Sequence, residues 1–320
     1  MKKIAIVIVI LIIAIVLFAI GRHIPFGAGN SVFHVEHTDR IYRILISGED
    51  NTVKLSRRSQ GWYVNDINIA RQGAVEFLLE TIGDISIKSP VSDEVYSDLV
   101  ESELTEHLEV KIYDKRKLMQ SFHVFRSANR DKPGIMQKRK NTKPFIMHMP
   151  GYDTDPTLYF FDDARFWLPF TVFRYRPSQI SEIQMNYYND PDSSFTINRT
   201  ENGIGFSSEE NENGAIDTMA VERYLSYFTF IPFENWAYNI SKAASDSITA
   251  GNPYFKLTVF TLDNDTINLF TWKRKIKKGN MLQVDTDRMW GTTNRAEDLF
   301  IIKYYDVDPL IKGPSYFISE

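Results

Sequence analysis

The sequence predicts an α+β protein: one transmembrane helix, then two tandem copies of a mostly antiparallel sheet with one main covering helix each. Three observations lead to this prediction. The N-terminus holds a long apolar run, two series of alternating polar and apolar segments follow in the same order, and each series contains one amphipathic helical segment. The chain has 320 residues, 43 % of them hydrophobic and 24 % charged, which is enough for two hydrophobic cores.

The apolar run follows Met1-Lys2-Lys3 and comprises seventeen residues, 4–20. As a helix it spans about 25 Å, close to the hydrocarbon thickness of a bilayer. We therefore expect residues 1–21 to be a single-pass anchor in the inner (cytoplasmic) membrane, which contacts the lipid bilayer through residues 4–20. The positive-inside bias places the N-terminus in the cytoplasm and the body in the periplasm. A cleaved signal peptide is the alternative, but its apolar region is usually about 7–15 residues long.

The first three segments of each series have the period of two that is typical of strands. They lie at 40–44, 53–57 and 61–64 in the first series, and at 179–183, 195–199 and 203–206 in the second. The corresponding segments are 139, 142 and 142 residues apart. A similar separation along the whole series indicates a duplicated unit.

Each series continues with a helix, at 74–82 and 220–228. The apolar positions recur at i, i+3, i+4 and i+7, which predicts one buried stripe about three turns long. These positions are Val75, Leu78, Leu79 and Ile82 in the first series, and Val221, Tyr224, Leu225 and Phe228 in the second.

Three further strand segments complete each series. They lie at 108–113, 122–126 and 135–137, and at 255–260, 269–273 and 281–283, with separations of 147, 147 and 146 residues. We therefore predict a juxtamembrane tether at 22–37, a first repeat at 38–176 and a second repeat at 177–320.

A family resemblance is carried by short packing motifs across nearly the whole chain. They are Ile41–Ile44, Val53–Arg57, Gly61–Val64, the helix Ala74–Ile82, and Phe166-Trp167-Leu168 leading into Phe173-Arg174-Tyr175-Arg176-Pro177. The pattern resembles an uncharacterised bacterial envelope domain family, with tandem copies behind an N-terminal transmembrane helix. Some members are encoded beside auxiliary subunits of gliding-type ABC transporters. The resemblance implies an envelope location and supplies no catalytic residues, and the second copy departs from it with Gly203–Phe206 in place of a Trp-containing segment.

Several function classes are disfavoured by composition and motif content. The formal net charge of −4 gives no overall field that would attract nucleic acid, and the absence of Cys excludes disulfides and thiolate chemistry. The sequence also lacks a nucleophile elbow, a phosphate-binding loop, a dinucleotide fingerprint and a His-Glu-x-x-His motif. We therefore predict that the chain is not an enzyme, and we assign no catalytic residue, metal or cofactor.

Three groups of titratable residues are weak candidates for chemistry, either as metal ligands or, for the dispersed histidines, as a general base. His34 and His37 would lie on opposite faces of a strand. His107, His123 and His148 are dispersed in the sequence. We expect His123 to be half-buried beside a residue of the adjacent strand and not to act as a base. The carboxylates around Pro156 lack the glycine and spacing of a calcium loop; they are Asp153, Asp155, Asp162 and Asp163.

Two basic clusters are the candidate contacts to anionic lipid or to an acidic partner. They consist of Lys138, Arg139, Lys140 and Lys143, and of Lys273, Arg274, Lys275, Lys277 and Lys278. The alternative is a solvated hairpin whose lysines protect a sheet edge from pairing with other chains.

Together these features predict a membrane-anchored periplasmic accessory or scaffold protein, such as an auxiliary component of a transporter. Its expected partners are integral membrane proteins of an envelope complex, for example an ABC transporter, and not nucleic acid. The alternative is a ligand-binding module with a polymer or small molecule in a cleft between the repeats. A hydrolase is the third possibility.

Overall fold

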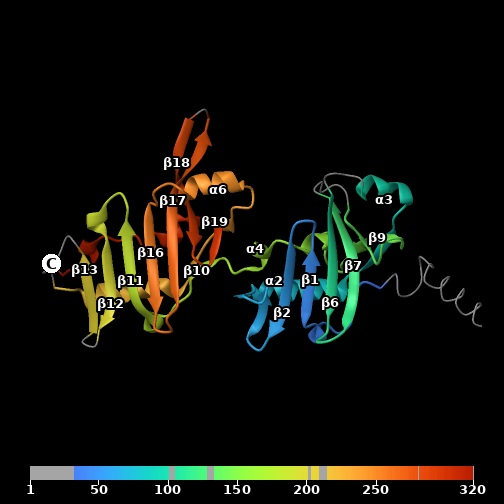
Figure 1. The fold of residues 1–320 in the computed structure, drawn as a ribbon, viewed down its shortest axis with the longest axis horizontal. Coiled ribbons are helices and arrows are strands. Elements are labelled where there is room, and N and C mark those ends of the chain that lie inside the picture. The colour runs from blue at the N-terminus through green and yellow to red at the C-terminus, as the bar shows by residue number, and fades with distance from the viewer. Residues whose placement is uncertain are drawn as a thin grey trace, which may run out of the picture. The chain divides into compact units, whose positions relative to one another are not determined.

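The structure is a computed structural model that describes residues 32–100, 105–127, 133–200, 203–208, 215–279 and 281–319. The chain divides into two compact units, Met1–Pro169 and Phe170–Glu320. This division lies seven residues before the boundary predicted between 176 and 177. Figure 1 shows the course of the chain through its two units.

The first unit is built on a nine-stranded sheet with the order β4-β3-β2-β1-β6-β7-β8-β9-β5. Its strands are β1 (Arg43–Ser47), β2 (Thr52–Arg58), β3 (Gly61–Val64), β4 (Asn68–Ile69), β5 (Ser86–Pro90), β6 (Thr105–Tyr113), β7 (Leu118–Ser127), β8 (Ile135–Gln137) and β9 (Pro144–His148). Its helices are α2 (Gln72–Asp84), α3 (Asp93–Val100) and α4 (Ala164–Trp167). Every pairing in the sheet is antiparallel.

The main core of this unit lies between one face of the sheet and α2. Alternate residues of a strand point to the same face of the sheet. On the covered face, Ile44 of β1 and Val110 of the neighbouring strand β6 are fully buried. From α2, Val75, Leu78 and Ile82 close this core. A second, smaller cluster beside α3 includes Leu99 and Phe125.

The segment immediately before the first sheet strand also packs into this core. Phe33 and Val35 are buried, although both lie in the part of the sequence predicted as a tether. The Phe33 ring contacts those of Phe122 and Phe145 edge-to-face, with 6.0 Å between centroids. The backbone N–H of Val35 donates to the carbonyl of Ile82 at 3.0 Å.

The second unit contains an eight-stranded antiparallel sheet with the order β13-β12-β11-β16-β17-β18-β19-β15, and a two-stranded sheet of β10 and β14. The strands are β10 (Thr171–Phe173), β11 (Ile180–Tyr187), β12 (Phe195–Thr200), β13 (Gly203–Ser208), β14 (Ile231–Pro232), β15 (Asn235–Trp236), β16 (Phe255–Thr261), β17 (Thr266–Lys278), β18 (Met281–Thr293) and β19 (Ala296–Lys303). The helices are α5 (Thr218–Ser226), α6 (Lys242–Thr249) and α7 (Tyr304–Val307).

Helix α5 supplies much of the core of the second unit. Asp217 caps it by accepting hydrogen bonds from the backbone N–H groups of Met219 and Ala220 at 2.9 and 3.1 Å. Tyr224 is fully buried, and its hydroxyl donates to the carbonyl of Leu310 at 3.0 Å. The hydrogen bond lets this aromatic side chain be buried without an unpaired polar atom.

The large sheets of the two units connect their strands in the same order. The first sheet, read from β3, runs β3-β2-β1-β6-β7-β8-β9-β5, and the second runs β13-β12-β11-β16-β17-β18-β19-β15. In each unit a helix, α2 or α5, precedes the last strand of this order, β5 or β15, and a second helix, α3 or α6, follows it.

The predicted fold class is nevertheless wrong, because the described part of the chain is mostly antiparallel β structure and not the predicted α+β fold. The sequence pattern underestimated the strands: the segment predicted at 281–283 is the beginning of β18, which has 13 residues. Long stretches of alternating side chains therefore build the sheets, while α2, the longest described helix, also has only 13 residues.

None of the helices in the described part of the chain is long and apolar enough to cross a membrane. A 13-residue helix such as α2 spans only about 20 Å, and its apolar residues occupy one side. This finding contradicts the predicted transmembrane, single-pass architecture and the inner-membrane location. The apolar run at 4–20, and the lipid contact predicted through it, lie outside the described residues.

We predict that Gly291→Ala destabilises the second unit. Gly291 of β18 is buried opposite Phe300 of β19, and a Cβ at this position would lie 2.4 Å from the ring. The Phe300 ring is fully buried and stacks on Phe233 with 4.4 Å between centroids, so it cannot move aside to make room for the added methyl group. We expect the free energy of unfolding to fall by about 1–3 kcal/mol in urea denaturation.

Gly313→Ala is the matched control, since a Cβ there meets nothing within 4 Å. Equal stability of the Gly291 variant and this control would contradict the tight packing of β18 against β19.

Candidate functional site

The most prominent surface feature of the second unit is the outer half of the β17–β18 hairpin. Figure 1 shows that this part of the hairpin projects beyond the rest of the unit. Here Lys275–Lys278 pair with Met281–Val284. All five basic residues of the second predicted cluster lie on β17, at or immediately before this projection.

A large bulge separates the projecting half from the sheet. Lys273 pairs with Met289, whereas Lys275 pairs with Val284, so residues 285–288 lie opposite Arg274 alone. Bulges of this kind bend a strand pair and change its direction.

A polar network built on Asp285 holds this bulge. Asp285 is only 4 % exposed, and its carboxylate accepts from Arg274 Nη1 at 3.0 Å and from the backbone N–H groups of Asp287 and Arg288 at 3.0 and 3.2 Å. The Arg288 guanidinium binds Glu234 through two hydrogen bonds, which lower the pKa of that carboxyl. Since these charged groups are paired at its base, the direction of the hairpin is fixed.

Both faces of the projecting hairpin combine lysines with apolar side chains. Residues that pair directly across two antiparallel strands share a face. One face therefore carries the pairs Lys275–Val284 and Lys277–Leu282, and the other carries Ile276–Gln283 and Lys278–Met281. Leu282 is 74 % exposed and Met281 66 %.

The first predicted basic cluster is different, because Lys138 does not reach the surface. Lys138 follows β8 and is buried, its ammonium donates to the side-chain carbonyl of Gln120, and it lies 5.6 Å from the Phe33 ring centroid. Burial, together with the nearby charge of Arg139, lowers the pKa of Lys138 from 10.5 to about 8. Lys143 pairs with Asp93 at 3.4 Å, so Arg139 and Lys140 are the exposed members of this cluster.

Strand pairing brings two of the predicted dispersed histidines together. His107 of β6 and His123 of β7 lie on the same face, with 3.0 Å between His107 Nε2 and His123 Nδ1. Burial lowers the pKa of both imidazoles, and the charge of His107 contributes to the shift at His123. His148 lies elsewhere on β9, with its Nε2 3.0 Å from Ser86 Oγ.

Three of the four carboxylates considered as calcium ligands have local structural roles. Asp155 accepts from the backbone N–H of Thr157 at 2.9 Å, and Asp163 from that of Arg165 at 2.9 Å, so both cap short helices. Asp162 lies 4.0 Å from the Arg126 guanidinium, and burial raises its pKa. Within the described ranges, no group of three or more His, Asp or Glu residues is placed to hold a metal ion.

A small pocket lies in the second unit, near the end of β11. Its volume is about 230 Å³, below the range of roughly 300–1,000 Å³ that is usual for small-molecule sites. It is lined by Tyr187, Asn189, Asp190, Ser193, Tyr254, Ile311, Lys312 and Gly313.

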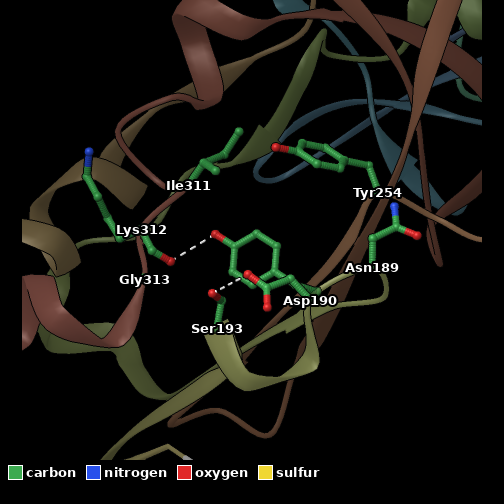
Figure 2. A pocket seen from close by; sticks show the side chains of 8 residues that line it. Asn189, Asp190, Ser193, Tyr254, Ile311, Lys312 and Gly313 are labelled. Carbon is green, nitrogen blue, oxygen red and sulfur yellow. Dashed lines mark hydrogen bonds between the residues drawn. The ribbon is translucent and has the colours of Figure 1, made fainter. Parts of the chain in front are cut away.

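The polar groups of this pocket largely bind one another, as Figure 2 shows. The Tyr187 hydroxyl donates to the carbonyl of Lys312 at 2.9 Å, and Ser193 Oγ donates to Asp190 at 2.6 Å. Burial raises the pKa of Tyr187, so this hydroxyl stays protonated. The alternative of a ligand-binding module stays a prediction.

Comparison with known proteins found no family model that matches the chain and no significant match among curated proteins. The resemblance to the bacterial envelope domain family therefore stays a prediction.

We predict that Asp285→Ala loosens the projecting hairpin. The substitution leaves the partly buried Arg274 guanidinium and two backbone N–H groups without their acceptor. Because Arg274 keeps a quarter of its side chain exposed, we expect a loss of about 2–3 kcal/mol, below the cost for a fully buried pair. Urea denaturation measures the loss, and amide hydrogen exchange at 275–284 should become faster.

Asp287→Ala is the control, because the exposed Asp287 side chain leaves the bonds to Asp285 in place. If both variants exchange at the wild-type rate, Asp285 does not hold the bulge.

We predict that Lys138→Met stabilises the first unit at neutral pH and changes its pH dependence. Between pH 8 and pH 10.5 the folded protein binds fewer protons at Lys138 than the unfolded chain, so the free energy of unfolding rises with pH in this window. Removal of the amine should abolish this contribution and add about 1–3 kcal/mol at pH 7.

The check is urea denaturation of wild type and variant at pH 7 and pH 10, with Lys140→Met as an exposed control in the same segment. A difference between wild type and the Lys138 variant that is the same at both pH values would rule out a depressed Lys138 pKa.

Proposed function

We propose that this chain is a non-catalytic accessory protein that attaches to anionic phospholipid through the projecting half of β17–β18. The observation that carries the proposal is the mixture of lysines and exposed apolar side chains on both faces of this hairpin.

The first support is local charge. The projecting residues 275–284 contain three lysines and no acidic side chain, in a chain with a formal net charge of −4. The hairpin is therefore a concentrated positive patch on an acidic protein. Each Lys or Arg close to an anionic lipid surface contributes about 1 kcal/mol of attraction.

The second support is the exposure of Met281, Leu282 and Val284 next to these lysines. At a lipid interface the apolar side chains can enter the acyl boundary while the lysine stems extend so that their ammonium groups reach the headgroups. Burial of the apolar side chains and attraction of the lysines together give a binding free energy of about 6–8 kcal/mol in favour of the bilayer. This corresponds to a Kd of roughly 1–50 μM. Such reversible binding suits an accessory protein.

The third support is that the two faces are chemically alike. An acidic protein surface would contact one face of a two-stranded ribbon, which would then differ from the other. A bilayer interface surrounds an inserted tip, and both faces would meet the same environment. The presence of a lysine and an apolar residue on each face therefore favours lipid.

In this role the hairpin would hold the protein beside integral membrane proteins of an envelope complex, which remain the proposed partners. The accessory role of the chain and its lack of catalytic activity belong to the same proposal.

The test is co-flotation of the full chain with vesicles of phosphatidylcholine alone or mixed with phosphatidylglycerol. We expect binding to the mixed vesicles that weakens as salt is added. The triple variant Lys275→Glu, Lys277→Glu, Lys278→Glu should bind at least about 100-fold more weakly, since each reversal replaces attraction by repulsion. Met281→Ser with Leu282→Ser should also weaken binding, without a change in its salt dependence.

The control is Arg139→Glu with Lys140→Glu, which reverses two exposed charges of the other cluster. Unchanged flotation of the triple variant, or equal binding to neutral and anionic vesicles, would overturn the proposal. Binding of the hairpin to an acidic protein without any binding to vesicles would also overturn it.

A further inference from the structure

The His107–His123 pair is placed by the register of two neighbouring strands. His107 pairs directly with Phe125, and Glu109 pairs directly with His123. The two imidazoles are therefore diagonal neighbours on one face of the sheet. Their nearest nitrogens, His107 Nε2 and His123 Nδ1, are 3.0 Å apart.

This spacing matches the needs of one metal ion held by two imidazoles. Imidazole nitrogens bind Zn²⁺ and similar divalent ions at about 2.0–2.1 Å. Two nitrogens 3.0 Å apart subtend an angle of about 91–97° at an ion held at that distance from each. An angle near 90° fits adjacent positions in the tetragonal geometry of Cu²⁺ or Ni²⁺ better than a tetrahedral site.

Neighbouring side chains hold the two imidazoles in position. The His107 ring stacks on Phe125, with 4.6 Å between centroids and an interplanar angle of 4°, and this fixes its plane. Phe125 is itself buried against Tyr96 beneath α3. The carboxylate of Glu109, next to the two histidines, already binds the ammonium of Lys111 at 2.7 Å.

We propose that His107 and His123 form a two-histidine site for a divalent transition-metal ion of the Cu²⁺ or Ni²⁺ type. The ion replaces the proton now shared between the two nitrogens and lies to one side of the line that joins them. This proton moves to the other nitrogen of its own ring, so both imidazoles stay neutral, and water fills the remaining metal positions. The site lies in the first unit and is independent of the proposed lipid contact.

The test is titration of the full chain with Cu²⁺, followed by calorimetry and electron paramagnetic resonance. We expect one tight equivalent per chain, with a spectrum that shows two nitrogen donors. His107→Ala and His123→Ala should each weaken this binding by at least about 10–100-fold, the loss found when even an outer partner of a metal ligand is removed.

The control is His34→Ala with His37→Ala, which removes the other closely spaced histidines of the sequence. This double variant should keep the tight equivalent. Binding that survives both His107→Ala and His123→Ala, or a wild-type spectrum without two nitrogen donors, would overturn the proposal. If a histidine variant unfolds, the His34→Ala, His37→Ala variant still tests the proposal, because loss of the two-nitrogen spectrum in this variant would overturn it.

Discussion

The requirement that each large sheet bury one face is the constraint on which the rest of this structure depends. An alternating strand places every second side chain on the same face, and that face must be covered to leave water. In the first unit α2 supplies the cover through Val75, Leu78 and Ile82, and in the second unit α5 does so through Val221 and Tyr224. Side chains outside the covered face can be charged or polar, and the lysines of the β17–β18 hairpin and the His107–His123 pair lie at such positions.

The β17–β18 hairpin extends beyond the covered part of its sheet. Leu269 and Trp272 of β17 are buried, whereas Lys275 and Lys277 of the same strand are exposed. A two-stranded ribbon has no core of its own and depends on its attachment for a defined direction. The buried carboxylate of Asp285 gives the ribbon that direction.

Several strands and the main helix of each unit could be predicted from the sequence, because hydrophobic periodicity reflects burial of one face. The segment predicted at 135–137 is β8, the segment at 53–57 lies within β2, and the helix at 74–82 lies within α2. The balance between strand and helix could not be predicted. The lysines of β17 interrupt the apolar alternation at Lys273, and α6 has no buried residue that would produce a stripe.

The candidate sites were predicted only in part, because local sequence says little about partners far away in the chain. The basic composition of 273–278 was visible, but its projection depends on a bulge formed by residues 285–288. Lys138 belongs to a run of basic residues that predicts a solvated surface, yet the run bends so that this one side chain enters the core. His107 and His123 meet only through the register of β6 and β7, which no spacing in the sequence reveals.

The shared strand order of the two sheets has a consequence for how the chain reaches its native state. Neighbouring units with the same connectivity can exchange equivalent strands, and misassembly of this kind is a characteristic failure of multidomain chains. The central pairings β1–β6 and β11–β16 join segments far apart in sequence, and non-local contacts of this kind slow folding and leave time for such errors. Differences in side-chain size at equivalent positions, such as Val53 in β2 and Phe195 in β12, make a strand from one unit a poor substitute in the core of the other. Such size differences favour pairing within each unit over exchange between the units.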